Sequence, residues 1–242
     1  IMTAVALALV AIAALLSGVS KTAIGGIGLV TAAMMAEVLP AKESTAALLI
    51  LLLFGDFYAS SVYHKTVEWS ALLRLAPSVL IGVVAGWRFL AAASDVQLRD
   101  FIGGLVLVLC AIHLVIRNRP KPEHLPHLVT FAAGALAGFT SMAANAAGSI
   151  MAIYLLNMHI DRRRYLGTTA WFFFALNLTK LPFSVQLGLF DSGSVLQILW
   201  ALPLVWLGAW AGKKWALRAS DRLFENLVLG SAIVGGLNLL LR

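Results

Sequence analysis

Two lysines lie deep in apolar sequence, where a charged side chain is expensive. Lys21 belongs to a stretch that runs from Gly18 to Gly28, and Lys180 lies within an apolar run at 165–187. A charge at the centre of a bilayer costs about 2.5–3.5 kcal/mol even on insertion-based scales. Two ammonium groups at this depth suit a small oxyanion and repel a cation. Snorkelling or a structural ion pair is the alternative for each lysine.

Asp56 is a third ionisable residue within an apolar run. At the offset of 124 residues that relates Thr45 to Thr169, Asp56 falls on Lys180. One half of the chain thus has an acid where the other has a base. We predict that Asp56 is a proton-coupling residue that releases a lysine when it takes up a proton. An ion pair with Lys21 or Lys180 is the structural alternative.

The stretch around Lys21 is rich in glycine and has a weaker copy at Gly138–Gly148, in which Asn145 replaces a glycine. Short helices that begin near Gly26 and near Ala146 would direct unpaired N–H groups toward the middle of the protein from opposite sides. The predicted substrate-binding residues are Lys21, Thr22, Gly25, Gly26, Asn145, Ala146, Asn177 and Lys180. Further neutral donors at this depth are Ser20, Ser141, Thr168 and Thr169, for which hydrogen bonding between helices is the more common role.

Other kinds of chemistry find no support in the sequence. Cys110 is the single cysteine and lies in an apolar run, which excludes a disulfide framework and a zinc site of the cysteine type. The five histidines lack ligand-like spacing. Neither a nucleophile–base pair nor a nucleotide-binding loop is recognisable. We therefore expect a protein that is not an enzyme and that holds no cofactor and no metal.

The composition is that of an integral membrane protein. Of the 242 residues, 61% are hydrophobic and only 12% charged, and the mean hydropathy is +0.91. Soluble domains have about 25% charged residues. The apolar runs are roughly 15–24 residues long, which predicts helices rather than a β-barrel. The net charge of +7 does not indicate nucleic-acid binding, because the basic residues lie in short loops.

The apolar runs divide into two similar halves. The first half is predicted to hold two short runs at 3–17 and 25–38, and full spans at 44–63, 69–91 and 96–116. The second half is predicted to hold short runs at 128–144 and 148–158, and full spans at 165–187, 195–217 and 222–241. Between them lies a polar, proline-rich linker at 117–127. The predicted domains are a first repeat at 1–116, the cytoplasmic linker, and a second repeat at 128–242.

Positions with special backbone roles match between the halves. Gly18 and Gly28 correspond to Gly138 and Gly148 at an offset of 120, and Pro77, Gly82 and Gly86 correspond to Pro203, Gly208 and Gly212 at an offset of 126. Each half has an odd number of full crossings, so the second half should be inverted relative to the first. The predicted fold class is an all-α polytopic membrane protein with two inverted-topology repeats, each a broken helical hairpin plus three transmembrane helices.

The distribution of basic residues supports this orientation. With the linker in the cytoplasm, eleven basic residues lie inside: Lys65, Arg117, Arg119, Lys121, Arg162, Arg163, Arg164, Lys213, Lys214, Arg218 and Arg222. Only four lie outside: Lys42, Arg88, Arg99 and Arg242. Both termini are therefore expected outside. Inverted repeats with broken helices are typical of secondary transporters, with the binding site near the midplane.

Four motifs, in this order and spacing, resemble the sulfite exporter TauE/SafE family over nearly the whole chain. They are Gly25-Gly26-Ile27-Gly28; Tyr63-His64; Gly167-Thr168-Thr169-Ala170 with Asn177 and Lys180-Leu181-Pro182; and the repeated Pro77-Gly82-Gly86 and Pro203-Gly208-Gly212. The resemblance implies export or uptake of sulfite, sulfoacetate or related organosulfonates. The second break departs from the family's usual glycine cluster, because it reads Asn145-Ala146-Ala147-Gly148.

We therefore expect a multi-pass secondary transporter of a small anion in a bacterial plasma (inner) membrane. It would work by alternating access, with Asp56 as the residue for proton coupling. An uncoupled channel or uniporter for the same anion, and a transporter of a small carboxylate, are the alternatives within transport. The expected partners are the anion and the lipid bilayer, with a homodimer left open and no nucleic acid. An intramembrane enzyme and a non-transporting assembly partner are alternatives of other classes.

Overall fold

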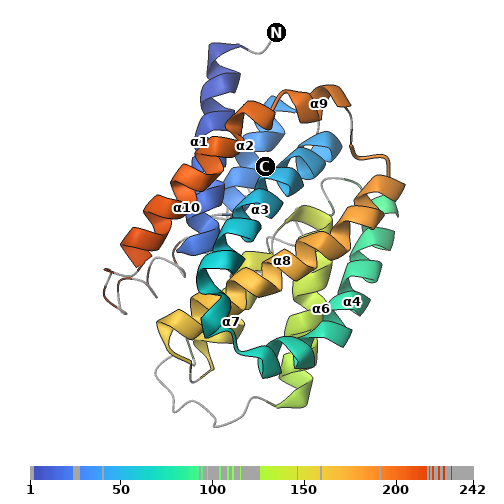
Figure 1. Cartoon of the computed structure of the whole chain (residues 1–242). Helices are drawn as coiled ribbons and strands as arrows, with labels where there is room; N and C mark the ends of the chain where they lie inside the picture. The colour runs from blue at the N-terminus through green and yellow to red at the C-terminus, as the bar shows by residue number, and fades with distance from the viewer. Residues whose placement is uncertain are drawn as a thin grey trace.

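The fold is seen in a computed structural model of the chain (Figure 1). The structure describes residues 3–23, 28–39, 41–92, 126–145, 147–158, 160–190 and 192–216, together with single positions between 94 and 115 and between 218 and 230. All regular elements within these ranges are helices, which confirms the predicted all-α class. Most of the predicted spans 96–116 and 222–241 and of the linker 117–127 lies outside the described residues.

The helices follow the predicted order. Their bounds are α1 Ala4–Thr22, α2 Gly28–Val38, α3 Ala41–Tyr63, α4 Trp69–Ala92, α6 His127–Ala144, α7 Ala147–Leu156, α8 Arg162–Gln186, α9 Ser192–Leu196 and α10 Leu202–Ala216. Two 3₁₀ turns, His64–Thr66 and Leu199–Ala201, precede α4 and α10. Among these residues, four segments are long and apolar enough to cross a membrane: Ala4–Thr22, Glu43–Thr66, Trp69–Ala92 and Ser192–Ala216.

The first break begins later than the sequence predicts. Helix α1 continues through Gly18 and Lys21 and ends at Thr22, so its 19 residues make a full-length helix instead of a short run at 3–17. Gly18 serves close packing: a Cβ atom there would lie 2.0 Å from the carbonyl oxygen of Val205 in α10. A glycine in an apolar run can mark a break or a close helix contact, and here it marks the contact.

The predicted continuous span 195–217 is also wrong in detail. The chain forms the short helix α9, a turn and a 3₁₀ turn before α10 begins at Leu202. Pro203 is the second residue of α10, where its missing N–H group does not interrupt the helix ladder. Proline there favours a helix start, whereas Pro77 is tolerated inside α4.

The two most extensive helix contacts are those of α1 with α10 and of α4 with α6. Both depend on glycines that let backbones touch. A Cβ atom on Gly208 would lie 2.1 Å from the carbonyl oxygen of Leu15, and one on Gly82 would lie 2.0 Å from that of Ala135. These contacts correspond at the sequence offsets of 126 and 120, as do those of Gly18 with Val205 and of Gly138 with Val79.

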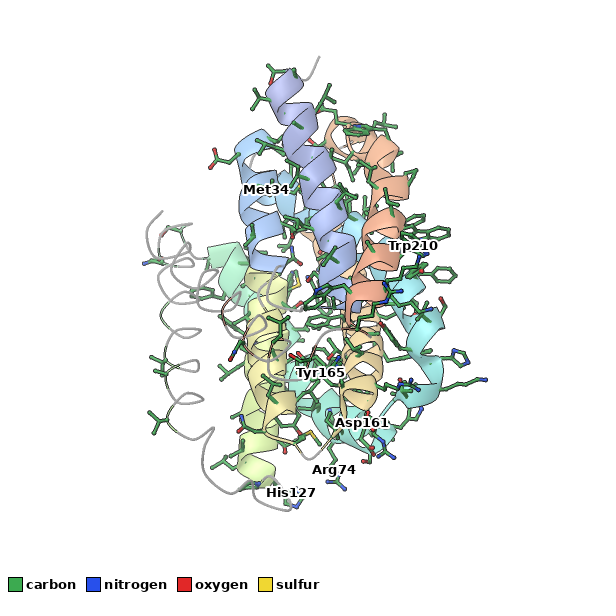
Figure 2. All side chains as sticks on the ribbon, turned by 90° about the vertical axis from the view of Figure 1, so that its left-hand side faces the viewer. Met34, Arg74, His127, Asp161, Tyr165 and Trp210 are labelled. Carbon is green, nitrogen blue, oxygen red and sulfur yellow. The ribbon has the colours of Figure 1, made fainter. Side chains whose placement is uncertain are left out.

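Two apolar cores form on either side of the α3–α8 contact. One gathers side chains of α1, α2, α3 and the start of α10, and the other gathers side chains of α4, α6, α7 and α8. Figure 2 shows His127, at the start of α6, at the end of the molecule opposite to the start of α1, with Arg74 and Asp161 nearby. Helices α1 and α6 thus enter from opposite ends and stop in the middle (Figures 1 and 2).

Candidate functional site

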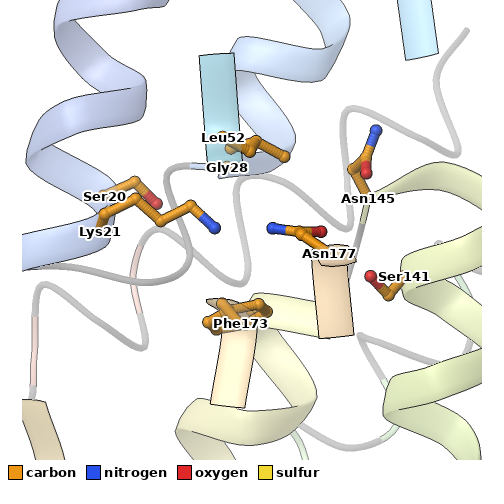
Figure 3. Close-up of a pocket in the computed structure, with 9 residues that line it drawn as sticks. Ser20, Lys21, Gly28, Leu52, Ser141, Asn145, Phe173 and Asn177 are labelled. Carbon is orange, nitrogen blue, oxygen red and sulfur yellow. The ribbon is translucent and has the colours of Figure 1, made fainter. Parts of the chain in front are cut away.

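A small pocket lies where α1 and α6 end (Figure 3). Nine residues line it, contributed by α1, α2, α3, α6 with its cap, α7 and α8: Ser20, Lys21, Gly28, Leu52, Ser141, Asn145, Gly148, Phe173 and Asn177. Its volume is about 20 Å³, which is roughly the room that one or two water molecules need. The pocket is thus small in this conformation.

Both helix breaks bring a helix start to this pocket. Helix α2 begins at Gly28 and α7 begins at Ala147, and both Gly28 and Gly148 line the pocket. The first turn of a helix has N–H groups without partners in the helix and carries positive potential, so it attracts anions. Helix α6 ends at Asn145 in the left-handed conformation, with φ 54° and ψ 31°, which asparagine tolerates better than most residues.

Lys21 and Asp56 form a buried ion pair. The Nζ atom of Lys21 lies 2.8 Å from Oδ1 of Asp56, and the carboxyl side chain is fully buried. The amide Nδ2 of Asn177 donates a hydrogen bond of 2.6 Å to Oδ2 of Asp56. The ammonium group also lies 4.6 Å from the centre of the Phe173 ring, a favourable cation–π distance. Of the two lysine partners predicted for Asp56, the structure pairs it with Lys21.

Lys180 lies behind the pocket wall and does not line the pocket. Its side chain is almost fully buried, and its Nζ donates to Oδ1 of Asn145 and, at 3.4 Å, to Oδ1 of Asn177. Among the described residues it has no carboxylate within ion-pair distance. With Lys21, Lys180 and Asp56 all charged, the cluster keeps one excess positive charge, which favours an anion in the pocket.

The remaining predicted site residues divide into three groups. Ser20 and Ser141 line the pocket as expected of neutral donors. Thr22 does not line it, because its hydroxyl donates to the carbonyl oxygens of Ala209 (2.8 Å) and Gly18 (3.2 Å), joining α1 to α10. Thr168 accepts a hydrogen bond from the backbone N–H of Glu68. Thr169 is buried in α8 outside the lining. The predicted binding residues Gly25, Gly26 and Ala146 lie outside the described residues.

Two apolar residues of the lining, Leu52 and Phe173, are not among the site residues predicted from the sequence. Phe173 precedes Asn177 by four residues, so both lie on one face of α8. Leu52 likewise precedes Asp56 by four residues on α3. The spacing to a predicted polar residue was therefore the signal that could have located both apolar lining residues.

A comparison with known protein families identifies the family of the chain. A model of the family "Sulfite exporter TauE/SafE" matches residues 10–239 of the chain. The chain belongs to this family. The resemblance inferred from the glycine, asparagine and lysine motifs is thereby confirmed. No curated protein and no solved structure matches the chain.

TauE/SafE membership and the apolar helices together make the chain an integral membrane transporter. Proteins of the sulfite exporter family transport solutes and are not enzymes. The pocket at the two helix breaks is the candidate place for a transported solute, because buried ionisable residues within transmembrane segments mark substrate pathways.

Proposed function

We propose that this TauE/SafE protein is a secondary transporter of a small oxyanion, with sulfite as the first candidate and sulfoacetate or a related organosulfonate next. One observation carries the proposal: the starts of α2 and α7 meet beside Lys21 in a small pocket, and the buried Lys180 behind its wall has no carboxylate within ion-pair distance among the described residues. Helix starts and an ammonium group together present N–H donors to an anion. Sulfite is placed first because it is the smallest of these anions and the pocket is small.

We propose further that the chain consists of two inverted repeats, 1–116 and 128–242, joined by a cytoplasmic linker at 117–127. The matching contacts of α1 with α10 and of α6 with α4 support this proposal, because they use glycines at corresponding offsets. The opposite directions of α1 and α6 also support it (Figure 1). Such repeats permit alternating access, in which one bundle rocks against the other around a central site.

The excess of basic residues on one side supports a position with both termini outside and the linker in the cytoplasm of a bacterial inner membrane. In Figure 2 the labelled Arg74, Asp161 and His127 lie at the end that this orientation places in the cytoplasm. We also propose that the protein assembles as a homodimer. Its test is the mass of the purified protein in a lipid nanodisc.

We propose that Asp56 couples transport to protons. Lys21 from α1 and, through Asn177, Lys180 from α8 are the charged groups that face Asp56 among the described residues. Protonation would neutralise the carboxylate and free Lys21 to bind the anion, so proton and anion would enter together. In Asp56→Asn, sulfite uptake should lose its response to an imposed proton gradient while sulfite binding remains. An unchanged response in that variant would refute proton coupling through Asp56.

An uncoupled channel or uniporter is the second candidate, and a carboxylate is the second candidate solute. The decisive measurement is uptake by proteoliposomes of sulfite, sulfoacetate and acetate at two pH values, for the native chain, Lys21→Ala and Lys180→Ala. The proposal expects saturable sulfite uptake that Lys21→Ala abolishes and that Lys180→Ala weakens. If neither substitution alters the uptake or binding of any of these anions, the site assignment is wrong.

A further inference from the structure

Helices α3 and α8 run antiparallel and are joined at both ends. Between these ends, Asn177 of α8 donates to Asp56 of α3. The 3₁₀ turn that follows α3 contacts the start of α8, and α9, which follows α8, contacts the start of α3. In Figure 1, α9 lies at the end of the molecule where α1 starts, and the chain passes from α3 to α4 at the opposite end.

The contact at the start of α8, which we call the Glu68 contact, is close. The backbone N–H of Glu68 donates to Oγ1 of the fully buried Thr168, at 3.0 Å. A Cβ atom on Gly167 would lie 2.5 Å from Oγ1 and 2.7 Å from the carbonyl oxygen of Thr66. Glycine at this position therefore lets the 3₁₀ turn approach the backbone of α8. Arg164 of α8 also pairs with the Glu68 carboxylate at 2.9 Å.

The contact at the start of α3, which we call the Glu43 contact, uses corresponding positions of the two halves. The hydroxyl of the buried Ser194 in α9 donates to Oε2 of Glu43 in the first turn of α3. Ser194 corresponds to Glu68 at the offset of 126, and Glu43 corresponds to Gly167 at the offset of 124. The same two places of each half therefore meet at opposite ends of the α3–α8 pair.

The pocket lies between these two contacts. Leu52 of α3 and Phe173 and Asn177 of α8 line it, and each lies in its helix between the contacting positions. Separation of α3 from α8 at one end would open a route along their facing sides from that end to the pocket. With both contacts formed, the pocket is small. Alternating access requires a barrier on each side of the site, and the two contacts lie where such barriers are needed.

We propose that the Glu43 contact and the Glu68 contact are the two gates of transport, each of which closes the pocket toward one side of the membrane. This inference rests on the proposed function. Breaking one contact destabilises the closed arrangement at that end alone, so the state that is open at that end becomes more populated. The loss of one hydrogen bond changes such an equilibrium by about threefold to tenfold.

The test measures how fast a cysteine in the pocket reacts from each side of the membrane. Ser141→Cys supplies the thiol, and Cys110→Ala removes the single native cysteine. The reagent, 2-sulfonatoethyl methanethiosulfonate, does not cross membranes and is added to right-side-out or to inside-out vesicles. Thr168→Val should speed the reaction from one side by about threefold to tenfold, and Ser194→Ala should speed it from the other side. This expectation holds whichever end faces the cytoplasm.

Thr179→Val and Ser61→Ala are the matched controls. The hydroxyl of Thr179 donates within α8 and that of Ser61 donates within α3, so neither substitution removes a contact between the two helices. Both should leave the two rates within about twofold of the background chain.

Glu43→Ala should act like Ser194→Ala, and the double variant should add nothing, because both substitutions remove the same contact. This pair keeps the test valid if Thr168→Val does not fold.

The outcomes separate the gates from the proposed function. If Thr168→Val and Ser194→Ala speed the reaction from the same side, from both sides equally or from neither side, the gate assignment is wrong, and sulfite uptake by the native protein still tests the proposed function. If the two variants act from opposite sides but the native protein takes up none of sulfite, sulfoacetate and acetate, the gates are supported and the proposed solutes are wrong.

Discussion

Asp56 and Lys180 lie 124 residues apart at corresponding places on α3 and α8, yet their surroundings differ. Asp56 has an opposite charge beside it, since Lys21 reaches across from α1. Lys180 faces only the amide oxygens of Asn145 and Asn177 within the described part of the chain. The described part of the first half thus pairs its buried acid with a lysine, whereas Lys180 in the second half has only neutral partners there. We propose that this difference makes the pocket attract anions.

Lys21→Met should produce the largest effect, because it leaves Asp56 as a buried carboxylate without its cation. Breaking a buried pair in this way costs about 3–5 kcal/mol of stability, and sulfite uptake should be lost. Thermal unfolding in detergent and proteoliposome uptake measure the two effects. The double variant Lys21→Met/Asp56→Leu should recover stability and stay inactive. If Lys21→Met alone is as stable as the native protein, the pair does not hold α1 to α3.

The glycine contacts test whether the two halves are built alike. In Gly18→Ala and Gly138→Ala the added Cβ would lie 2.0 Å and 2.2 Å from the carbonyl oxygens of Val205 and Val79. Each substitution should cost about 1–3 kcal/mol, measured by thermal unfolding. Gly104→Ala is the control, because nothing lies within 4 Å of a Cβ there. Unequal costs for Gly18 and Gly138 would contradict equivalent packing in the two halves.

Lys180→Met should affect binding more than folding. No described carboxylate forms an ion pair with Lys180, so stability should stay near the native level. Sulfite affinity should fall by on the order of tenfold, because a positive charge a few ångströms from the anion is removed. Equilibrium binding and unfolding of the same sample make the comparison with Lys21→Met direct. A loss of stability as large as that of Lys21→Met would place an unseen acid beside Lys180.

Glu68→Gln should have the smallest effect. Its ion pair with Arg164, at 2.9 Å, joins the turn before α4 to α8, but Arg164 is 58% exposed. Exposed pairs contribute about 0.2–1 kcal/mol, so the unfolding temperature should change little and less still in high salt. A cost above that range would show that this surface contact fixes the position of α8 and with it Asn177.

The sequence indicated most of the polar residues near the pocket but not their partners, and the predicted Thr22 and Lys180 do not line it. Five polar residues were recognisable because each lies in or beside apolar sequence, where polar groups are costly and usually functional. They are Lys21, Asp56, Asn145, Asn177 and Lys180. The sequence does not decide whether Asp56 pairs with Lys21 or with Lys180. The pairing depends on how α1, α3 and α8 pack together. The arrangement of the pocket and its apolar lining therefore could not be predicted from the sequence, although most of its polar residues could.

Helix boundaries show a similar division. The order and type of the helices followed from hydropathy, whereas the start of α10 at Leu202, beside Pro203, did not. The end of α1 did not follow from the sequence, because a glycine such as Gly18 can mark either a helix break or a close helix contact. Its role follows from the approach of α10, which comes from the other half of the chain. Whether such a glycine breaks a helix depends on long-range packing, which the local sequence does not reveal.

The left-handed backbone of Asn145 narrows the mutations that this protein can accept on the way to a new specificity. With φ at 54°, the position suits glycine and asparagine, with aspartate as a further option, and penalises larger or branched residues by backbone strain. Ser141 lies on the same side of the pocket in regular helix and has no such restriction. Directed evolution of substrate range should therefore accumulate changes at Ser141, while residue 145 stays within its small set.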